Sequence, residues 1–224
     1  MYILYHYPIC PLSRKIRILL SEKGVKFNGV IEEYWNKRDN FLRLNPLGSV
    51  PTLIATPDKS IYDHSVIFEY IEEKYPNRLL LPEGVDERAY ARKLCLHFES
   101  SFYSDVAGKI LNQRYYNFII DGLSPQDKIL NKARQFMRSF FDEGSRLIEK
   151  NGGNYILGDY LSIVDISFAA QISSLDYFGE IPWDDYHILK NWYILIKSRP
   201  SFREILSDKI PGFKPYKSYE DLDY

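Results

Sequence analysis

The sequence predicts two domains, an α/β domain followed by an all-helical domain. Short apolar strand patterns alternate with helical patterns up to Pro76, and beyond Asp86 long helical patterns follow without a convincing strand. At 224 residues the chain is long enough to bury two compact cores. We therefore expect an α/β domain over residues 1–78, a linker over 79–86, a helical domain over 87–208 and a tail over 209–224.

The first domain is expected to form a mixed sheet with helices against it. Residues 2–6 alternate apolar side chains and predict a strand, and the helix that follows should have Ser13 near its cap and stop at Gly24. Ser65 is expected to cap a later helix that ends at Pro76. The other expected elements are a strand within 25–34, a short helix over 39–46, and a hairpin of strands within 50–56 and 60–63.

The second domain shows helical patterns only. Ser162 and Asp165 have the spacing of a capping box, which predicts that a helix begins there. The end of the chain, KIPGFKPYKSYEDLDY, is broken by proline and glycine and predicts a tail. The helices are expected near 87–120, 125–150, 162–178, 185–198 and 201–207.

Composition excludes several classes of function. The 29 Lys and Arg nearly balance the 30 Asp and Glu and form no block, so we expect no nucleic-acid binding. No apolar run is long enough for a membrane span, so no membrane insertion is expected, and MYILYHY lacks the features of a signal peptide. Two cysteines, Cys10 and Cys95, are too few for a disulfide framework, which favours a cytoplasmic protein. The four histidines show no metal-ligand spacing, so no metal site is predicted.

The stretch Cys10-Pro11-Leu12-Ser13 lies between a predicted strand and a predicted helix. A thiol at a helix N-terminus meets unpaired amides, which lower its pKa and favour the thiolate. Ser13 in the same place could instead donate a hydrogen bond to a bound thiolate, or only cap the helix while Cys10 fills space. The sequence leaves these three readings open.

Two further positions have the chemistry of a binding site. Pro51 begins a predicted strand and removes a ladder donor, so a cis Val50–Pro51 bond is one interpretation, with the polar backbone of Val50 turned toward the Cys10 turn. Ser65 and the amides of its helix start could hold a carboxylate, although capping is the commoner role of such a serine.

Taken in order, these motifs resemble the cytosolic glutathione transferase superfamily. The resemblance rests on Cys10-x-x-Ser13, NPLGSVPTL, Ser65, LSIVD and RPSF, which together span nearly the whole chain. It implies a thioredoxin-like N-terminal domain, a helical C-terminal domain and a homodimer. It also implies that Val50 and a cis Pro51 pair with the cysteinyl part of glutathione, that Ser65 takes the γ-glutamyl carboxylate, and that Ser13 or Cys10 faces the sulfur. No cofactor is required, and glutathione would be a co-substrate.

His64 departs from the superfamily pattern. Active members usually carry Glu or Gln immediately before the serine that corresponds to Ser65, beside the glutathione amino group. An imidazole in this place offers no negative charge. Losing a charge-assisted hydrogen bond of roughly 1.5–3 kcal/mol would weaken binding by about one to two orders of magnitude, unless Asp63 compensates.

A narrower resemblance concerns the bacterial FtsZ-binding glutathione-transferase-like proteins. It rests on residues 172–213, on the terminal YEDLDY and on EEYWNKRDNFLRLNP. It implies a non-enzymatic cell-division adaptor, a homodimer that presents two copies of one surface to FtsZ filaments. Trp35 is the expected aromatic contact and Asp221 the expected acidic contact.

The function therefore has one leading prediction and two alternatives. The first alternative is a glutathione-dependent transferase, or a thiol oxidoreductase, that acts on small electrophiles through Ser13 or Cys10. The second is a fold with a vestigial site and an unidentified partner. The acidic tail, with Leu222 and Tyr224 beside its aspartates, suits docking onto a partner or onto its own domain, and a frayed end is the other interpretation.

Overall fold

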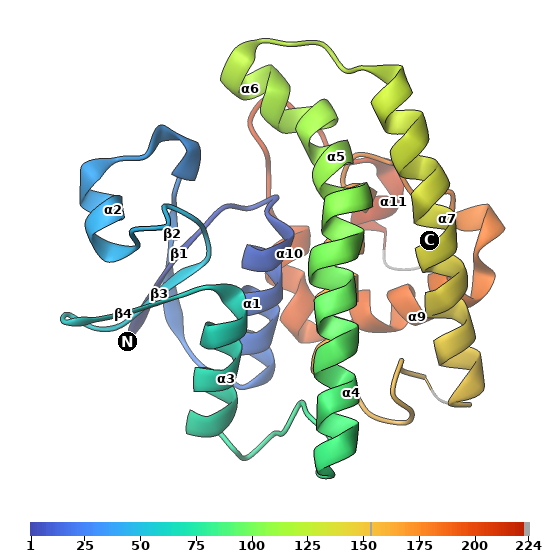
Figure 1. Ribbon diagram of the computed structural model, residues 1–224, viewed down its shortest axis with the longest axis horizontal. Helices are drawn as coiled ribbons and strands as arrows, with labels where there is room; N and C mark the ends of the chain where they lie inside the picture. Colours follow the sequence, from blue (N-terminus) through green and yellow to red (C-terminus); the bar gives the residue numbers. More distant parts are fainter. Residues whose placement is uncertain (153, 222–224) are drawn as a thin grey trace. The chain divides into compact units, whose positions relative to one another are not determined.

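The computed structural model describes residues 1–152 and 154–221. It divides into two compact units, shown within Figure 1. The first unit contains Met1–Leu80 and Pro200–Phe213, and the second contains Leu81–Arg199 and Lys214–Tyr224. The sequence placed residues 200–213 in the helical domain and the tail, whereas they pack within the α/β unit.

A four-stranded sheet in the order β2-β1-β3-β4 forms the centre of the first unit. β1 (Tyr2–His6) runs parallel to β2 (Phe27–Ile31), and β3 (Thr52–Thr56) runs antiparallel to both β1 and β4 (Lys59–Tyr62). The predicted strands and the predicted hairpin are therefore present, and the sheet is mixed as expected (Figure 1).

Helices cover both faces of this sheet (Figure 1). α1 (Pro11–Glu22) and α3 (His64–Lys74) pack against each other on one face. α2 (Asp39–Leu44) lies on the other face, where the buried ring of Phe41 is 5.5 Å from the ring of Tyr5 in β1. The arrangement is thioredoxin-like, and it places the N-termini of α1 and α3 near the sheet edge that carries the candidate site.

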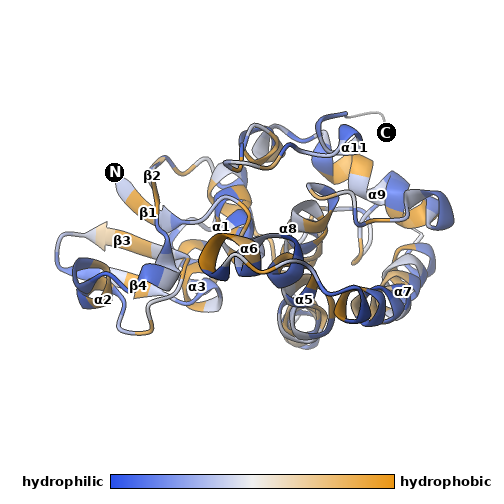
Figure 2. Cartoon of the chain, turned by 90° about the horizontal axis from the view of Figure 1, so that it is seen from above, coloured by the Kyte–Doolittle hydropathy of each residue, from blue (hydrophilic) through white to orange (hydrophobic). Residues whose placement is uncertain are grey.

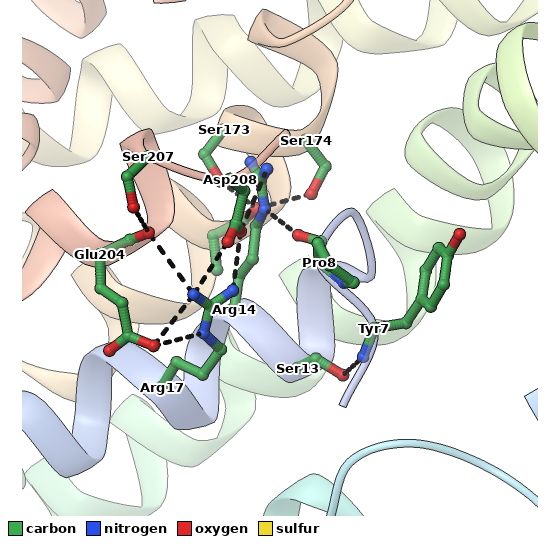
Figure 3. A network of polar contacts seen from close by, with 11 residues as sticks. Tyr7, Pro8, Ser13, Arg14, Arg17, Ser173, Ser174, Glu204, Ser207 and Asp208 are labelled. Carbon is green, nitrogen blue, oxygen red and sulfur yellow. Dashed lines mark hydrogen bonds and ion pairs between the residues drawn. The ribbon is translucent and has the colours of Figure 1, made fainter. Parts of the chain in front are cut away.

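An ion-pair cluster holds the C-terminal segment 200–213 on α1. The segment contains η6 (Pro200–Phe202) and α10 (Arg203–Leu206), and both contact α1. The buried guanidinium of Arg17 donates to both carboxylate oxygens of Asp208, at 2.7 and 3.0 Å, and to Glu204 (Figure 3). Burial alone would lower the pKa of Arg17, but its hydrogen bonds and these two carboxylates raise it. Charge pairing across nearly two hundred residues of sequence therefore joins this segment to the first unit.

Every named element that the structure describes in the second unit is a helix. Its first helix continues through π-helical turns into a long rod that ends at Gly122, which has a positive φ of 66°. α7 mixes hydrophilic and hydrophobic residues along its length (Figure 2), and its buried residues recur at helical spacing. Among the described residues, no helix combines the length and apolar character needed to span a membrane. The helices are α4 (Val85–Leu96), α5 (Gly108–Leu111), α6 (Asn117–Asp121), α7 (Asp127–Lys150), α8 (Ile163–Asp176) and α9 (His187–Lys197).

The buried helix α8 organises the core of this unit. The predicted capping box is confirmed, because the Ser162 side chain accepts from the Asp165 backbone amide and the Asp165 carboxylate accepts from the Ser162 backbone amide at 2.9 Å. The same carboxylate oxygen also accepts from the Ser162 hydroxyl at 2.6 Å. The other oxygen of Asp165 accepts from the Ile156 amide at 2.8 Å and the Trp192 indole at 2.9 Å. Every residue of α8 is buried, and Phe168 stacks on Phe98 with ring centres 4.1 Å apart.

The tail forms a short helix, α11 (Lys217–Glu220), that the sequence did not predict. The Tyr216 amide donates to the Tyr177 carbonyl at 2.9 Å, and the buried ring of Tyr219 lies 5.1 Å from the ring of Tyr177. Residues 214–221 of the tail therefore pack on the helical unit, and docking onto its own domain was one of the interpretations of the sequence. Leu222 and Tyr224 lie outside the described residues.

Candidate functional site

The strand directions bring the predicted site segments to one edge of the sheet. β1 and β2 are parallel and end together, with His6 opposite Ile31. β3 starts beside the end of β1, with Tyr5 opposite Thr52, and β4 ends beside the start of β3, with Thr52 opposite Tyr62. The Cys10 turn, the Trp35 loop, Pro51 and the start of α3 therefore all follow or precede strands at this edge.

Cys10, and not Ser13, is the N-cap residue of α1. Pro11 takes the first helical position, where the missing amide hydrogen costs nothing, and this moves the helix start ahead of the predicted one. Ser13 is fully buried within the first turn, and its hydroxyl oxygen accepts from the Tyr7 amide at 3.3 Å (Figure 3). The expectation that Ser13 caps the helix is wrong; it instead ties the loop after β1 to the helix.

Burial reverses the pKa shift expected for Cys10. Desolvation raises the pKa of the thiol, and hydrogen bonds from Ser13 and the Leu12 amide oppose the shift without cancelling it. The Sγ atom lies 4.0 Å from the Val50 carbonyl oxygen, to which the thiol donates. The prediction that the helix N-terminus favours the thiolate is therefore wrong, because the protonated thiol is the favoured form.

The Val50–Pro51 peptide bond is cis, as the sequence suggested. The side-chain Nδ2 of Asn45 donates to the Ser49 carbonyl at 2.8 Å and to the Thr52 hydroxyl at 3.0 Å, which holds the loop on both sides of the bond. Val50 faces the Cys10 thiol through its carbonyl, as its place before the proline implied. The backbone feature that the resemblance associates with a cysteinyl group is thus present.

Asp63, and not Ser65, caps α3. Its carboxylate accepts from the Ser65 amide at 2.8 Å and from the Ser65 hydroxyl, and its backbone has a positive φ of 70°. Partial burial raises the pKa of Asp63, but the hydrogen bonds from Ser65 outweigh it and hold the pKa below its ordinary value. The residue expected to bind the γ-glutamyl carboxylate therefore already donates to a charged carboxylate, and His64 is the half-buried first residue of the helix.

Trp35 lies in η1 (Tyr34–Asn36), directly after β2. Its half-buried ring meets the buried Tyr7 ring edge-on at 4.8 Å and the Tyr34 ring at 5.3 Å. Since the Tyr7 amide donates to Ser13, the aromatic contact predicted for a partner sits beside the turn predicted for catalysis. Tyr7 was missed by the sequence reasoning, and its place directly after β1 was the available signal.

Asp221 is exposed at the end of α11, in the helical unit. Its backbone carbonyl accepts from the Lys197 ammonium at 2.6 Å. Lys197 was also missed, because a lysine at the end of an amphipathic helix reads as a surface residue. Within the described residues, no three His, Cys, Asp or Glu side chains gather into a potential metal site.

Comparison with known proteins agrees with this geometry. Family models for the glutathione S-transferase N-terminal domain and C-terminal domain match residues 4–79 and 112–209. The chain belongs to the glutathione S-transferase family. The expected glutathione transferase fold is therefore confirmed, with a thioredoxin-like first domain and a helical second domain.

Individual relatives narrow the similarity further. FtsZ-localized protein A of Caulobacter vibrioides is 34% identical over 99% of this chain and 97% of its own length. The structure of FzlA from C. crescentus has a TM-score of 0.95 at 34% identity and covers 100% of this chain and 99% of that one. A glutathione S-transferase from Rhodospirillum rubrum F11 has a TM-score of 0.95 at 35% identity, with both chains fully covered. The chain is thus similar over its whole length to a protein named for FtsZ and to one named as a transferase.

Proposed function

We propose that this protein is a non-enzymatic cell-division adaptor that binds FtsZ filaments. The observation that carries the proposal is the 34% identity with FtsZ-localized protein A over 99% of the chain. The proposal is also supported by the site itself, where the Cys10 thiol donates to the Val50 carbonyl and the Ser13 hydroxyl accepts from the Tyr7 amide.

The state of the site residues favours binding over catalysis. Ser13 is fully buried and accepts from the Tyr7 amide, and burial raises the pKa of Cys10, so neither offers a ready nucleophile. The charged Asp63 carboxylate next to Ser65 repels a second carboxylate at the same donors. Both effects weaken the glutathione site that the family fold otherwise provides.

Trp35 and Asp221 are the proposed partner contacts. The Trp35 ring is partly exposed and held by two aromatic neighbours, which lowers the entropy lost when it is buried by a partner. Asp221 exposes an acidic side chain on a tail that is fixed to its own unit. A homodimer would carry two copies of each contact, and two sites on one body gain avidity on a filament without new contacts.

Co-sedimentation with polymerised FtsZ tests these contacts. Asp221→Lys and Trp35→Ala should each reduce the pelleted fraction, with an apparent affinity loss of about tenfold or more, as truncating an anchor does. Asp58→Lys is the matched control, because it reverses an exposed acidic charge in the turn between β3 and β4, and it should pellet like the unmodified protein. Unchanged pelleting of both Asp221→Lys and Trp35→Ala would contradict the assignment of these contacts.

A glutathione-dependent transferase or thiol oxidoreductase is the second candidate. It is favoured by the matches to both glutathione S-transferase domain models and by the 35% identity with the glutathione S-transferase from Rhodospirillum rubrum F11. Titration calorimetry with glutathione distinguishes the two candidates. The adaptor proposal expects no binding tighter than about 1 mM, an affinity of roughly 4 kcal/mol. Tighter binding, together with turnover that is lost in Ser13→Ala or Cys10→Ala, would favour the enzyme.

A further inference from the structure

Lys197, in α9, has a buried side chain whose ammonium binds the C-terminal tail. Lys197 is 1% exposed, although it is the last residue of its helix. Lysine pays a large desolvation cost in such a place and is rarely buried unless its ammonium is fully partnered. The tail supplies those partners, so the burial has a specific structural reason.

Groups from the tail and from α8 bind the ammonium, which also lies 5.8 Å from the centre of the Tyr193 ring. Its hydrogen bonds go to the backbone carbonyls of Ser218 and, at 2.6 Å, Asp221, and the Asp176 carboxylate lies 4.0 Å away. Both carbonyls belong to the last turn of α11 and the residue after it. A cation here satisfies carbonyls that a four-residue helix cannot pair internally, and it meets the negative end of the helix dipole.

Asp176 also binds the tail directly. Asp176, at the end of α8, accepts from the Ser218 hydroxyl at 3.2 Å and from the Trp183 indole at 3.0 Å. The Trp183 ring stacks on the Tyr193 ring, with centres 5.0 Å apart, one turn before Lys197 on α9. Lys197 and Asp176 therefore connect the tail to both α8 and α9, and burial raises the pKa of Asp176 and lowers the pKa of Lys197 despite their mutual attraction.

We propose that Lys197 is a positioning residue for partner binding: its ammonium fixes the last turn of the tail, so that the Asp221 side chain is presented in one place. This inference rests on the proposed function. Asp221 is exposed, and the Lys197 ammonium binds its backbone carbonyl, so the chain that carries its side chain is held in place. A partner contact on an unrestrained tail would lose conformational entropy when it binds. The contacts of Lys197, called the clamp below, order the tail already in the free protein.

Lys197→Met tests the clamp, because methionine keeps the unbranched chain and removes the ammonium. Lys217→Met is the matched control, since it removes an exposed lysine from the tail itself. Hydrogen exchange followed by mass spectrometry should show the amides of residues 216–221 exchanging about tenfold faster or more in Lys197→Met, and unchanged in Lys217→Met. Lys197→Arg keeps the charge and should recover part of the protection. Ser218→Ala, which removes one tail hydrogen bond without touching α9, serves if Lys197→Met does not fold, and it should raise exchange by a few-fold.

Pelleting with polymerised FtsZ is then measured on the same variants. If Lys197 positions the tail, Lys197→Met should lower the apparent affinity for the polymer about tenfold. Lys197→Arg should recover part of this affinity, and Lys217→Met should keep the affinity of the unmodified protein. Faster tail exchange with unchanged pelleting would overturn the positioning role and leave the proposed function standing. Unchanged tail exchange in Lys197→Met would overturn the clamp itself. If the unmodified protein does not pellet with FtsZ, the proposed function fails, and the exchange data still decide whether Lys197 holds the tail.

Discussion

At the scale of single residues, burial decides how the ionisable groups of the candidate site behave. Cys10 sits at a helix N-terminus, where a thiolate is ordinarily stabilised, yet desolvation raises its pKa. His6, four residues earlier, is 7% exposed, and desolvation together with the positive charge of Arg17 lowers its pKa to about 3. The sequence correctly places His6 at the end of β1 and Cys10 between this strand and α1, but it carries no measure of the burial that sets their charge.

The depressed pKa of His6 predicts a pH-dependent stability. Between about pH 6.5 and pH 3 the unfolded chain binds a proton at His6 that the folded chain does not, so stability falls as the pH is lowered through this window. The expected slope is about 1.4 kcal/mol per pH unit. His6→Gln cannot titrate and should show a shallower slope by about this amount when urea unfolding is measured at pH 7, 6 and 5. Equal slopes for the two proteins would contradict a neutral, buried His6.

At the scale of elements, periodicity and turn residues were sufficient for most of the fold. The strands, the hairpin, the short α2 and the capping box of α8 follow from local patterns, and all are present. Both predicted serine caps of the first unit were wrong. In each case a neighbouring residue decides where the helix begins. Pro11 takes the first helical position of α1, and the Asp63 carboxylate caps α3.

Long-range pairing was beyond the reach of these local patterns. Segment 200–213 joins the first unit through Arg17, Asp208 and Glu204, and the tail joins the second unit through Lys197. Charged residues in helices read as solvent-exposed, because the sequence does not show which opposite charge they meet. The same limit hid Tyr7 as the residue that links Trp35 to Ser13.

The Arg17–Asp208 pair predicts how strongly this segment is held. Asp208→Ala leaves the buried guanidinium without its two-pronged partner, and it should cost about 3 kcal/mol or more of unfolding free energy. Lys209→Ala removes the exposed neighbouring charge and should change stability by less than about 0.5 kcal/mol. Chemical denaturation of the two variants measures the difference. A loss below about 1 kcal/mol for Asp208→Ala would mean that apolar packing, and not the ion pair, holds the segment.

At the scale of the whole molecule, the chain keeps the glutathione transferase fold while its site residues are engaged internally. The fold and family are shown, and the resemblance reached them from motifs that are individually weak. The choice between adaptor and enzyme depends on properties that no motif encodes: the buried thiol, the charged cap beside Ser65 and the held tail. These three features point in the same direction as the similarity to FtsZ-localized protein A.

The most direct test of the adaptor is whether the unmodified protein binds FtsZ polymers without glutathione. The full chain is sedimented with polymerised FtsZ of its own organism, with unpolymerised FtsZ as the control, in the absence and presence of millimolar glutathione. An adaptor that binds FtsZ filaments should pellet with the polymer alone, to the same extent in both conditions. Failure to pellet, or pelleting only when glutathione is added, would contradict it.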